Sequence, residues 1–473
     1  MNAAQSLAQL SDAAGGLGLS SLVSGELLFL EIAVLVFLIL WPLFLSTWMF
    51  WRNEEFKRGL KWILLEIKVP REIDKSPKAM EQVLGSIHAL RNTANDFGEK
   101  YWDGEVTRWY CFEMVSFGGE VHLYMRIYYK QRDLIEAAFF SYYKDVELIE
   151  VDDYVDERFP KDVRELYAQG YDMWGSEMML ARPDAYPIKS YADFEAVGSN
   201  IEGDQQFDPI SAFLEVLAKA KKEEIVGIQI LAAPASPTWH KEWKPLVEEL
   251  SRTRKKSSTA SSVTTKIDFP GGPLPAFEAQ GKTKDSGLDD FSKIFNRSPG
   301  ETDALKAVEK NLSKQAFKSL IRFIYFSPKS IFYDSYARRG LSGAFNQYAS
   351  LDLNYFVQNY SVSTRTKIWN FPFVFPKWRN EFRKQRLLYM YVRRKRPIET
   401  KMGKLLTSYI FNWNIHSRTF NLSVESLATL FHPPTRFVLT APHMIRAESR
   451  KTGPPAGLAI FGEEEKLERF TRE

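Results

Sequence analysis

The sequence predicts an α+β protein with one N-terminal transmembrane helix, two α+β units and a basic helical C-terminal region. Three observations support this fold class. An apolar stretch near the N-terminus contains no charged residue from Ile32 to Trp51. Behind it, short strand patterns alternate with amphipathic helix patterns. Positive charge is then concentrated at residues 377–396.

The apolar stretch predicts a transmembrane helix over residues 26–51. A helix rises about 1.5 Å per residue, so about 20 apolar residues cross a hydrocarbon core of about 30 Å. The alternative is a buried core helix of a soluble protein. Core helices are seldom uncharged on every face over such a length, which favours the membrane span.

The charges on either side of this helix predict its orientation. Residues 1–25 contain no Lys or Arg and are expected to form a flexible extracytoplasmic tail. Basic flanks stay in the cytoplasm, so the N-terminus is expected outside and the bulk of the chain inside, at the cell inner (cytoplasmic) membrane. The tail lacks the basic start and cleavage site of a signal peptide. The basic residues after the helix are Arg52, Lys57, Arg58, Lys61, Lys68 and Arg71.

Composition sets wide bounds. A chain of 473 residues has room for two or three domains, and an aromatic content of 14% indicates hydrophobic cores. The net charge of +4 is small for this length and does not by itself indicate nucleic acid binding. The single cysteine, Cys111, excludes an intrachain disulfide and a cysteine-based zinc site, in keeping with a reducing compartment.

Residues 60–155 are predicted to form the first α+β unit. A strand at 62–69 precedes a helix that Ser76 and Pro77 begin, and Gly118-Gly119 joins two strands into a hairpin. A second helix over 131–143 and a strand over 146–151 follow. This β-α-β-β-α-β order is the ferredoxin-like pattern, with two helices on one face of a four-stranded antiparallel sheet.

Residues 165–350 are predicted to form a second α+β unit of the same ferredoxin-like type, although one sequence cannot establish it as a copy of the first. Its expected elements are strands at 170–182, 225–233 and 316–326 and helices at 208–220, 240–250, 301–313 and 328–349. Residues 251–299 are rich in Ser, Thr, Gly and Pro and are expected to be a disordered linker. The Gly281-Lys282-Thr283 triplet inside it lacks the glycine and leading strand of a nucleotide-binding loop, so no nucleotide site is predicted.

Residues 351–450 form the predicted C-terminal region, followed by a polar tail at 451–473. A strand is expected at 405–413 and a short helix at 423–430. The basic helix 377–396 has a cationic face and an apolar face. It could be a solvated helix packed by its apolar side, lie on an anionic membrane surface, or contact nucleic acid phosphates. The candidate phosphate- or membrane-surface-binding residues are Lys377, Arg379, Arg383, Lys384, Arg386, Arg393, Arg394, Lys395 and Arg396.

The sequence contains no recognisable catalytic constellation. Its six histidines are scattered without metal-ligand spacing, and no Gly-x-Ser-x-Gly nucleophile motif is present. We therefore expect a non-enzyme without metal, nucleotide or other cofactor. An enzymatic site assembled from distant residues is the weaker alternative.

Five short motifs carry a resemblance to a known family. They lie at residues 64–71 directly after the membrane helix, 112–116, 208–210 leading to 228–231, 312–314 with 321–325, and 423–432. Together they resemble the membrane-proximal N-terminal region of bacterial type IV secretion or conjugative coupling ATPases of the FtsK and HerA type. In that family the last motif lies just before the ATPase domain and is followed by a proline-rich link similar to Pro454-Pro455.

The resemblance implies a membrane anchor module without its motor, because the sequence has no valid Walker A site. The expected function is a non-catalytic scaffold or adaptor of a type IV secretion or DNA-translocation-like system, docking a separate P-loop ATPase or secretion subunit. The alternative is a membrane-tethered nucleic-acid-binding protein that uses residues 377–396 and 252–256, with DNA as partner. The oligomeric state stays open, a homo-oligomer included.

Overall fold

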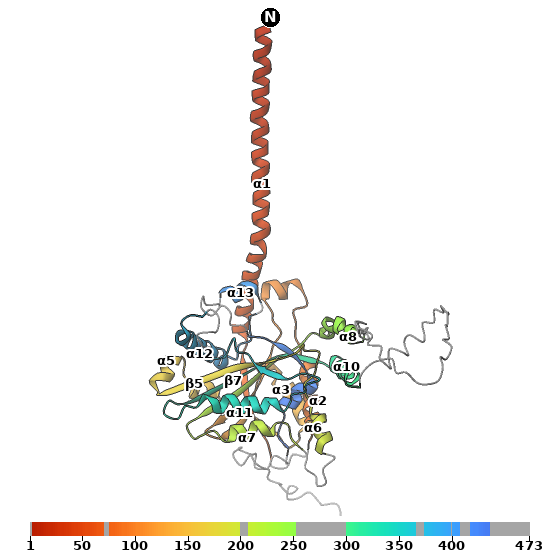
Figure 1. Ribbon diagram of the computed structural model, residues 1–473, viewed down its shortest axis with the longest axis vertical. Coiled ribbons are helices and arrows are strands. Elements are labelled where there is room, and N and C mark those ends of the chain that lie inside the picture. The colour runs from red at the N-terminus through yellow and green to blue at the C-terminus, as the bar shows by residue number, and fades with distance from the viewer. Residues whose placement is uncertain are drawn as a thin grey trace, which may run out of the picture.

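The computed structural model describes residues 2–70, 75–198, 207–251, 299–365, 373–398, 400–406 and 417–435. Within these ranges the protein is a mixed α+β structure with an antiparallel sheet and one long N-terminal helix, which confirms the predicted fold class at that level (Figure 1). The polar tail at 451–473 and all but the first and last residues of the predicted linker 251–299 lie outside the described residues.

The N-terminal helix α1 extends over Asn2–Gly59, well beyond the predicted span 26–51 at both ends. The prediction of a flexible tail at 1–25 is therefore wrong for Asn2 onward. This segment is rich in Ala and Leu, which are strong helix formers, and it continues a helix that is already nucleated. At the other end, pairs of opposite charge three residues apart, such as Glu54 with Lys57, extend the helix to Gly59.

The N-terminal half of the sheet domain, residues 62–151, follows the predicted β-α-β-β-α-β order. Ser76 caps the first helix by accepting a hydrogen bond from the Lys78 amide. Gly118 and Gly119 turn the hairpin with φ of 63° and 96°, values that side chains other than glycine rarely adopt. The elements are β1 Trp62–Lys68, α2 Pro77–Ala89, β2 Tyr110–Phe117, β3 Glu120–Tyr128, α3 Arg132–Tyr142 and β4 Glu147–Val151.

The C-terminal half, residues 171–358, extends past the predicted boundary at 350 because a short strand, β8, completes it. The helix predicted at 328–349 begins only at Asp334, since Pro328 ends the preceding strand and a turn follows. A pair of helices, α8 Lys244–Ser251 and α10 Pro299–Leu312, lies between β6 and β7. The remaining elements are β5 Tyr171–Leu180, α6 Tyr191–Gly198, α7 Ser211–Ala218, β6 Ile225–Pro234, β7 Ala316–Pro328, α11 Asp334–Asn346 and β8 Phe356–Gln358.

One sheet contains the strands of both halves, in the order β4-β1-β3-β2-β6-β7-β5-β8. From its outer edge inward, each half therefore orders its strands fourth, first, third, second. The two second strands, β2 and β6, pair antiparallel at the centre, with Met114 opposite Ile228. The halves are thus continuous through backbone hydrogen bonds.

The C-terminal region differs from the prediction at three points: the strand expected at 405–413, a strand at Phe420–Ser423 that was not expected, and the basic helix expected at 377–396, which ends at Val392. Leu405 and Leu406, expected in a strand at 405–413, belong to the helix α13 Lys401–Leu406, and residues 407–416 lie outside the described part. A short run of apolar residues of this kind does not separate strand from helix. The strand β9 Phe420–Ser423 pairs with β7 and leads into α14 Val424–Leu430, while the basic helix α12 spans Pro376–Val392.

The two faces of the sheet are covered by different helices. Because side chains alternate along a strand, Phe112 and Met114 point to one face of β2, and Glu113 and Val115 to the other. The first face packs against α2, α3, α7, α11 and α14 in an apolar core. The second face packs against α12 and the short helices α4 Tyr154–Arg158 and α5 Val163–Ala168.

Candidate functional site

The end of α1 is built into the sheet domain at several points. The Trp48 indole Nε1 donates to the Tyr101 carbonyl at 2.7 Å, and the Arg52 side chain donates to the Trp102 carbonyl. Both carbonyls belong to the one-turn π-helix η1 Gly98–Asp103. Gly104 ends this helix with φ of 68°, where a Cβ atom would overlap the Arg52 backbone. The helix therefore enters the domain through a packed joint.

Apolar side chains are exposed at the same end of the domain. Phe97 and Trp102 are 76% and 69% exposed beside η1, and Leu405 and Leu406 are exposed on α13. Helix α13 contacts α1, and its Met402 amide donates to the Ser46 hydroxyl at 3.2 Å. The helix segment Phe29–Gly59 that rises from this end is long and apolar enough to cross a membrane (Figure 1).

The structure distributes the nine basic candidate residues among three environments. Arg379, Arg383 and Arg394 are buried in the protein. Lys384 is largely buried and donates to the Asp172 carboxylate at 2.6 Å. Lys377 and Arg393 are exposed, and Arg386, Lys395 and Arg396 line a pocket beside α1. The single cationic helix face expected from the sequence is therefore divided between the interior and the surface.

Arg394 is the centre of a buried ion-pair network on the second face of the sheet. Its guanidinium contacts the Glu113 carboxylate at 2.5 Å and the Asp153 carboxylate at 2.5 Å. The Tyr154 hydroxyl donates to Glu113 at 2.6 Å. Arg394 follows α12 with φ of 48°, a left-handed conformation that turns its side chain into the protein. Burial alone would lower the pKa of Arg394, but the buried Glu113 carboxylate, Tyr154 and the hydrogen bond to Asp153 raise it well above its usual value.

A second buried pair holds the same end of α12. Arg322 and Glu177 are both fully buried, with a 2.9 Å ion pair. Arg322 also donates to the Met390 carbonyl at 2.9 Å, and Gln229 donates to the Tyr391 carbonyl at 3.1 Å. These residues were not among the sequence candidates. The available signal was the position of a charged residue between apolar neighbours within a strand, as in Ile321-Arg322-Phe323.

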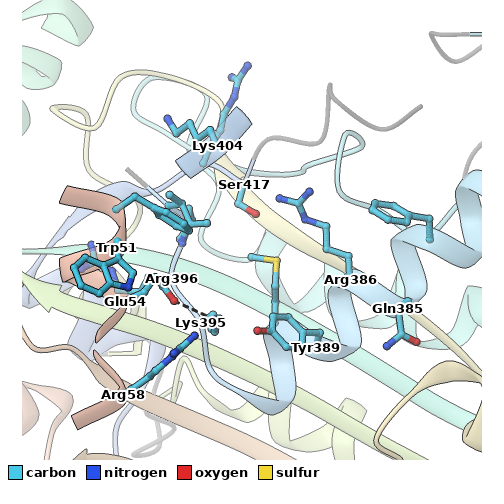
Figure 2. Close-up of a pocket in the computed structure, with 16 residues that line it drawn as sticks. Trp51, Glu54, Arg58, Gln385, Arg386, Tyr389, Lys395, Arg396, Lys404 and Ser417 are labelled. Atoms are coloured by element: carbon cyan, nitrogen blue, oxygen red, sulfur yellow. Dashed lines mark hydrogen bonds and ion pairs between the residues drawn. The ribbon is translucent and has the colours of Figure 1, made fainter. Parts of the chain in front are cut away.

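A pocket of about 800 Å³ lies between the end of α1 and the outer side of α12 (Figure 2). We refer to it as the α1–α12 pocket. Trp51 and Glu54 face Arg386 and Tyr389 across it. Its apolar and aromatic lining comes from Phe50, Trp51, Phe382, Tyr389, Met390 and Ile398. Its cationic lining comes from Arg58, Arg386, Lys395, Arg396, Lys404 and Arg418.

The charge of the α1–α12 pocket is strongly positive. Glu54 is the acidic residue in its described lining, and it pairs with Lys395 at 3.4 Å. Arg386 has no hydrogen bond or ion pair to any residue that the structure describes. Burial lowers the pKa of Arg386; Glu177 opposes this shift and Arg322 adds to it. The pocket is therefore suited to an anion with an apolar portion.

Two of the sequence motifs meet at a buried Asp–His pair. His432 Nε2 lies 2.8 Å from Asp208 Oδ1, and His432 Nδ1 lies 2.8 Å from the Ala428 carbonyl. The Asp208 carboxylate also accepts from the Thr435 amide and hydroxyl. Both side chains are buried, so the pair ties the end of α14 to the start of α7. Across the described residues, no group of three or more His, Cys, Asp or Glu side chains is placed to hold a metal ion.

Comparison with known proteins places the chain in a family. Residues 52–445 match the family model described as Domain of unknown function (DUF8128). The chain belongs to this family. The matched region begins at the charged end of α1 and includes the sheet domain, α12 and α14, so it covers the residues of the α1–α12 pocket except Phe50 and Trp51. No curated protein matches the chain.

Proposed function

We propose that this protein is a non-catalytic, single-pass scaffold of the inner (cytoplasmic) membrane, with its N-terminus outside and its sheet domain in the cytoplasm. The packed joint between α1 and the domain carries the proposal. Trp48, Arg52, Glu54 and Ser46 all contact residues far along the chain. A domain joined in this way is held at a constant orientation against the bilayer, as a docking platform requires.

The expected partner is a separate P-loop ATPase or secretion subunit of a type IV secretion or DNA-translocation-like system. This part of the proposal rests on the short sequence motifs alone. Affinity purification of the tagged full chain in mild detergent should recover such a partner. The matched control is residues 1–59 fused to an unrelated soluble domain. Recovery of the protein alone, or of the same partners by the control, would contradict the proposal.

The proposed topology has its own test. In intact cells, a protease added from outside should leave a C-terminal tag uncut, and a tag at the N-terminus should be removed. Replacing Arg52, Lys57, Arg58 and Lys61 together by Gln should reduce this asymmetry, because the basic flank sets orientation. Cleavage of the C-terminal tag in the unmodified protein would overturn the topology.

At the level of the fold, we propose that the two halves are two ferredoxin-like units. The support is their shared fourth-first-third-second strand order, with the helices α8 and α10 inserted between the second and third strands of the second half. In this view β2 and β6 occupy equivalent positions and pair across a pseudo-two-fold axis. To test this, residues 60–155 are expressed alone. They should fold as a separate domain, because a single ferredoxin-like unit would retain its own sheet.

The competing proposal is a membrane-tethered nucleic-acid-binding protein. The exposed basic residues in this part of the described chain include Lys377 on α12 and Arg393 directly after it. Replacing both with Gln should reduce the slope of DNA affinity against salt by about two, because each phosphate contact contributes about one. Absence of DNA binding by the full chain at about 50 mM salt would remove this alternative.

A further inference from the structure

We propose that the α1–α12 pocket binds the phosphate and glycerol portion of an anionic phospholipid from the leaflet around the end of α1. The inference rests on the proposed membrane anchoring and adds a ligand to it. Three independent features of the pocket lead to it: its depth relative to the bilayer, its charge, and its mixed lining.

The depth follows from α1 itself. The uncharged run ends at Trp51, which marks the edge of the hydrocarbon core. The headgroup layer extends about 5–8 Å beyond that edge. Arg58 lies seven residues further along the helix, a rise of about 10 Å. The wall of the pocket formed by residues 51–58 therefore passes through the headgroup layer, where phospholipid phosphates lie.

The charge follows from the positions of the basic side chains. Arg386 projects from α12 toward the pocket and lacks an acceptor among the described residues. Arg58 and Arg418 approach from α1 and from the segment before β9. A phosphate between them would supply the acceptors that a half-buried guanidinium needs, in a charge-assisted hydrogen bond. Ser417 adds a hydroxyl with no partner in the described part of the chain.

The mixed lining favours a lipid over a free phosphate ion. Phe50, Trp51, Tyr389 and Ile398 offer apolar surface that an inorganic ion cannot use. The volume of about 800 Å³ lies within the range of about 300–1,000 Å³ that is usual for small-molecule sites. The exposed Leu405 and Leu406 on the neighbouring α13 continue this apolar surface toward the bilayer.

The test uses the full chain in detergent micelles, with bound lipid counted by native mass spectrometry. The probes are phosphatidylglycerol, phosphatidylcholine and inorganic phosphate. We expect the unmodified protein to prefer phosphatidylglycerol over phosphatidylcholine. The substitution Arg386→Gln should reduce this preference about fivefold, the scale for one basic residue at an anionic surface, and Arg386→Gln with Arg418→Gln about 25-fold.

Matched controls separate a local effect from loss of structure or of charge in general. Arg386→Lys keeps the charge and should retain most of the preference. Lys219→Gln with Lys222→Gln removes two exposed charges beside α7, at the opposite end of the domain from α1, and should leave it unchanged (Figure 1). Arg418 is exposed, so Arg418→Gln reports on the site even if Arg386→Gln disturbs folding.

Three outcomes would overturn the proposal. The first is equal binding of the two lipids. The second is a preference that the Lys219 and Lys222 variant loses as much as the Arg386 and Arg418 variant. The third is displacement of phosphatidylglycerol by an equal concentration of inorganic phosphate, which would assign the pocket to a free anion. None of these depends on the topology test, so anchoring can hold while the lipid site fails.

Discussion

The two faces of the nine-stranded sheet are covered by different kinds of side chain. The face under α2, α3, α7, α11 and α14 is filled with apolar side chains such as Phe112 and Ile230. The face under α12 also buries charged groups, among them Glu113, Arg322 and Arg394. Apolar contacts tolerate small shifts, whereas ion pairs and their hydrogen bonds fix direction.

This difference matters for the site because α12 forms one wall of the α1–α12 pocket. The buried arginines Arg322 and Arg394 hold the carboxyl end of α12 and the turn that follows it. The next residue, Lys395, then reaches Glu54 on α1. The polar face of the sheet is therefore connected to α1 through a short run of the chain. The following substitutions test this comparison, from the largest expected effect to the smallest.

Arg394→Met should have the largest effect, a loss of about 3–5 kcal/mol in the free energy of unfolding, because it leaves Glu113 buried without its partner. The double variant Arg394→Met with Glu113→Leu should recover most of that loss, since apolar residues can replace a buried pair. Urea unfolding in detergent, followed by near-ultraviolet circular dichroism, measures both. A double variant as unstable as the single one would show that the network acts through more than this pair.

Ile230→Ala on the apolar face should cost about 2–5 kcal/mol through lost burial and a cavity. In contrast to the polar face, recovery requires added volume and not removal of a partner. The same urea unfolding assay measures this loss. If a change in charge alone restored the stability of Ile230→Ala, the apolar and polar faces of the sheet would not differ in this way.

Gly227→Ala should cost about 1–3 kcal/mol, because the new methyl group would overlap the Tyr391 hydroxyl where α12 packs closely on β6. In a Tyr391→Phe background the added cost should be smaller. A double-mutant cycle measures this coupling. Additive effects would show that α12 does not depend on the close approach at Gly227.

Asp208→Asn tests the buried Asp208–His432 pair on the apolar side. Burial raises the pKa of Asp208, but His432 and the hydrogen bonds from His432, Thr435 and Ile210 bring it below its usual value of 3.8. The carboxylate thus stabilises the fold above the unfolded-state pKa of about 3.9, and this contribution is lost as pH falls through the lower folded-state value. The variant should lose about 1–3 kcal/mol at pH 7.

The difference between Asp208→Asn and the unmodified protein should therefore shrink below about pH 4. Thermal unfolding across a pH series measures it. The exposed Asp156 offers a matched control, since Asp156→Asn should change stability little at any pH. A difference that stays constant down to pH 3 would show that the carboxylate acts through its shape and not through its charge.

Glu54→Gln should have the smallest effect, under about 1 kcal/mol, because its 3.4 Å pair with Lys395 is partly exposed. The same variant removes the acidic residue from the described lining of the α1–α12 pocket, so phosphatidylglycerol should bind more tightly. Unfolding and native mass spectrometry together check the two expectations. A large loss of stability would show that the Glu54–Lys395 pair stabilises the joint between α1 and the domain more than a partly exposed ion pair should.

Much of the fold could be predicted from local sequence. The apolar period of helices, the Ser76-Pro77 start and the Gly118-Gly119 turn lead to elements that the structure contains. The continuity of the sheet could not be predicted, because β2 and β6 are far apart in the chain and backbone hydrogen bonds leave no side-chain pattern. The basic residues of α12 could be identified as a group. Their separation into buried and pocket-lining residues could not.

The sequence by itself determined the long apolar helix, its one-sided basic flank and the alternation of strands and helices, because hydrophobic period and charge act over a few residues. The tertiary structure alone decided which charges are buried and which line a pocket. Arg394 meets Glu113, and Arg386 faces Trp51, only because segments hundreds of residues apart pack together. Burial and pairing are properties of those contacts, and no local pattern contains them.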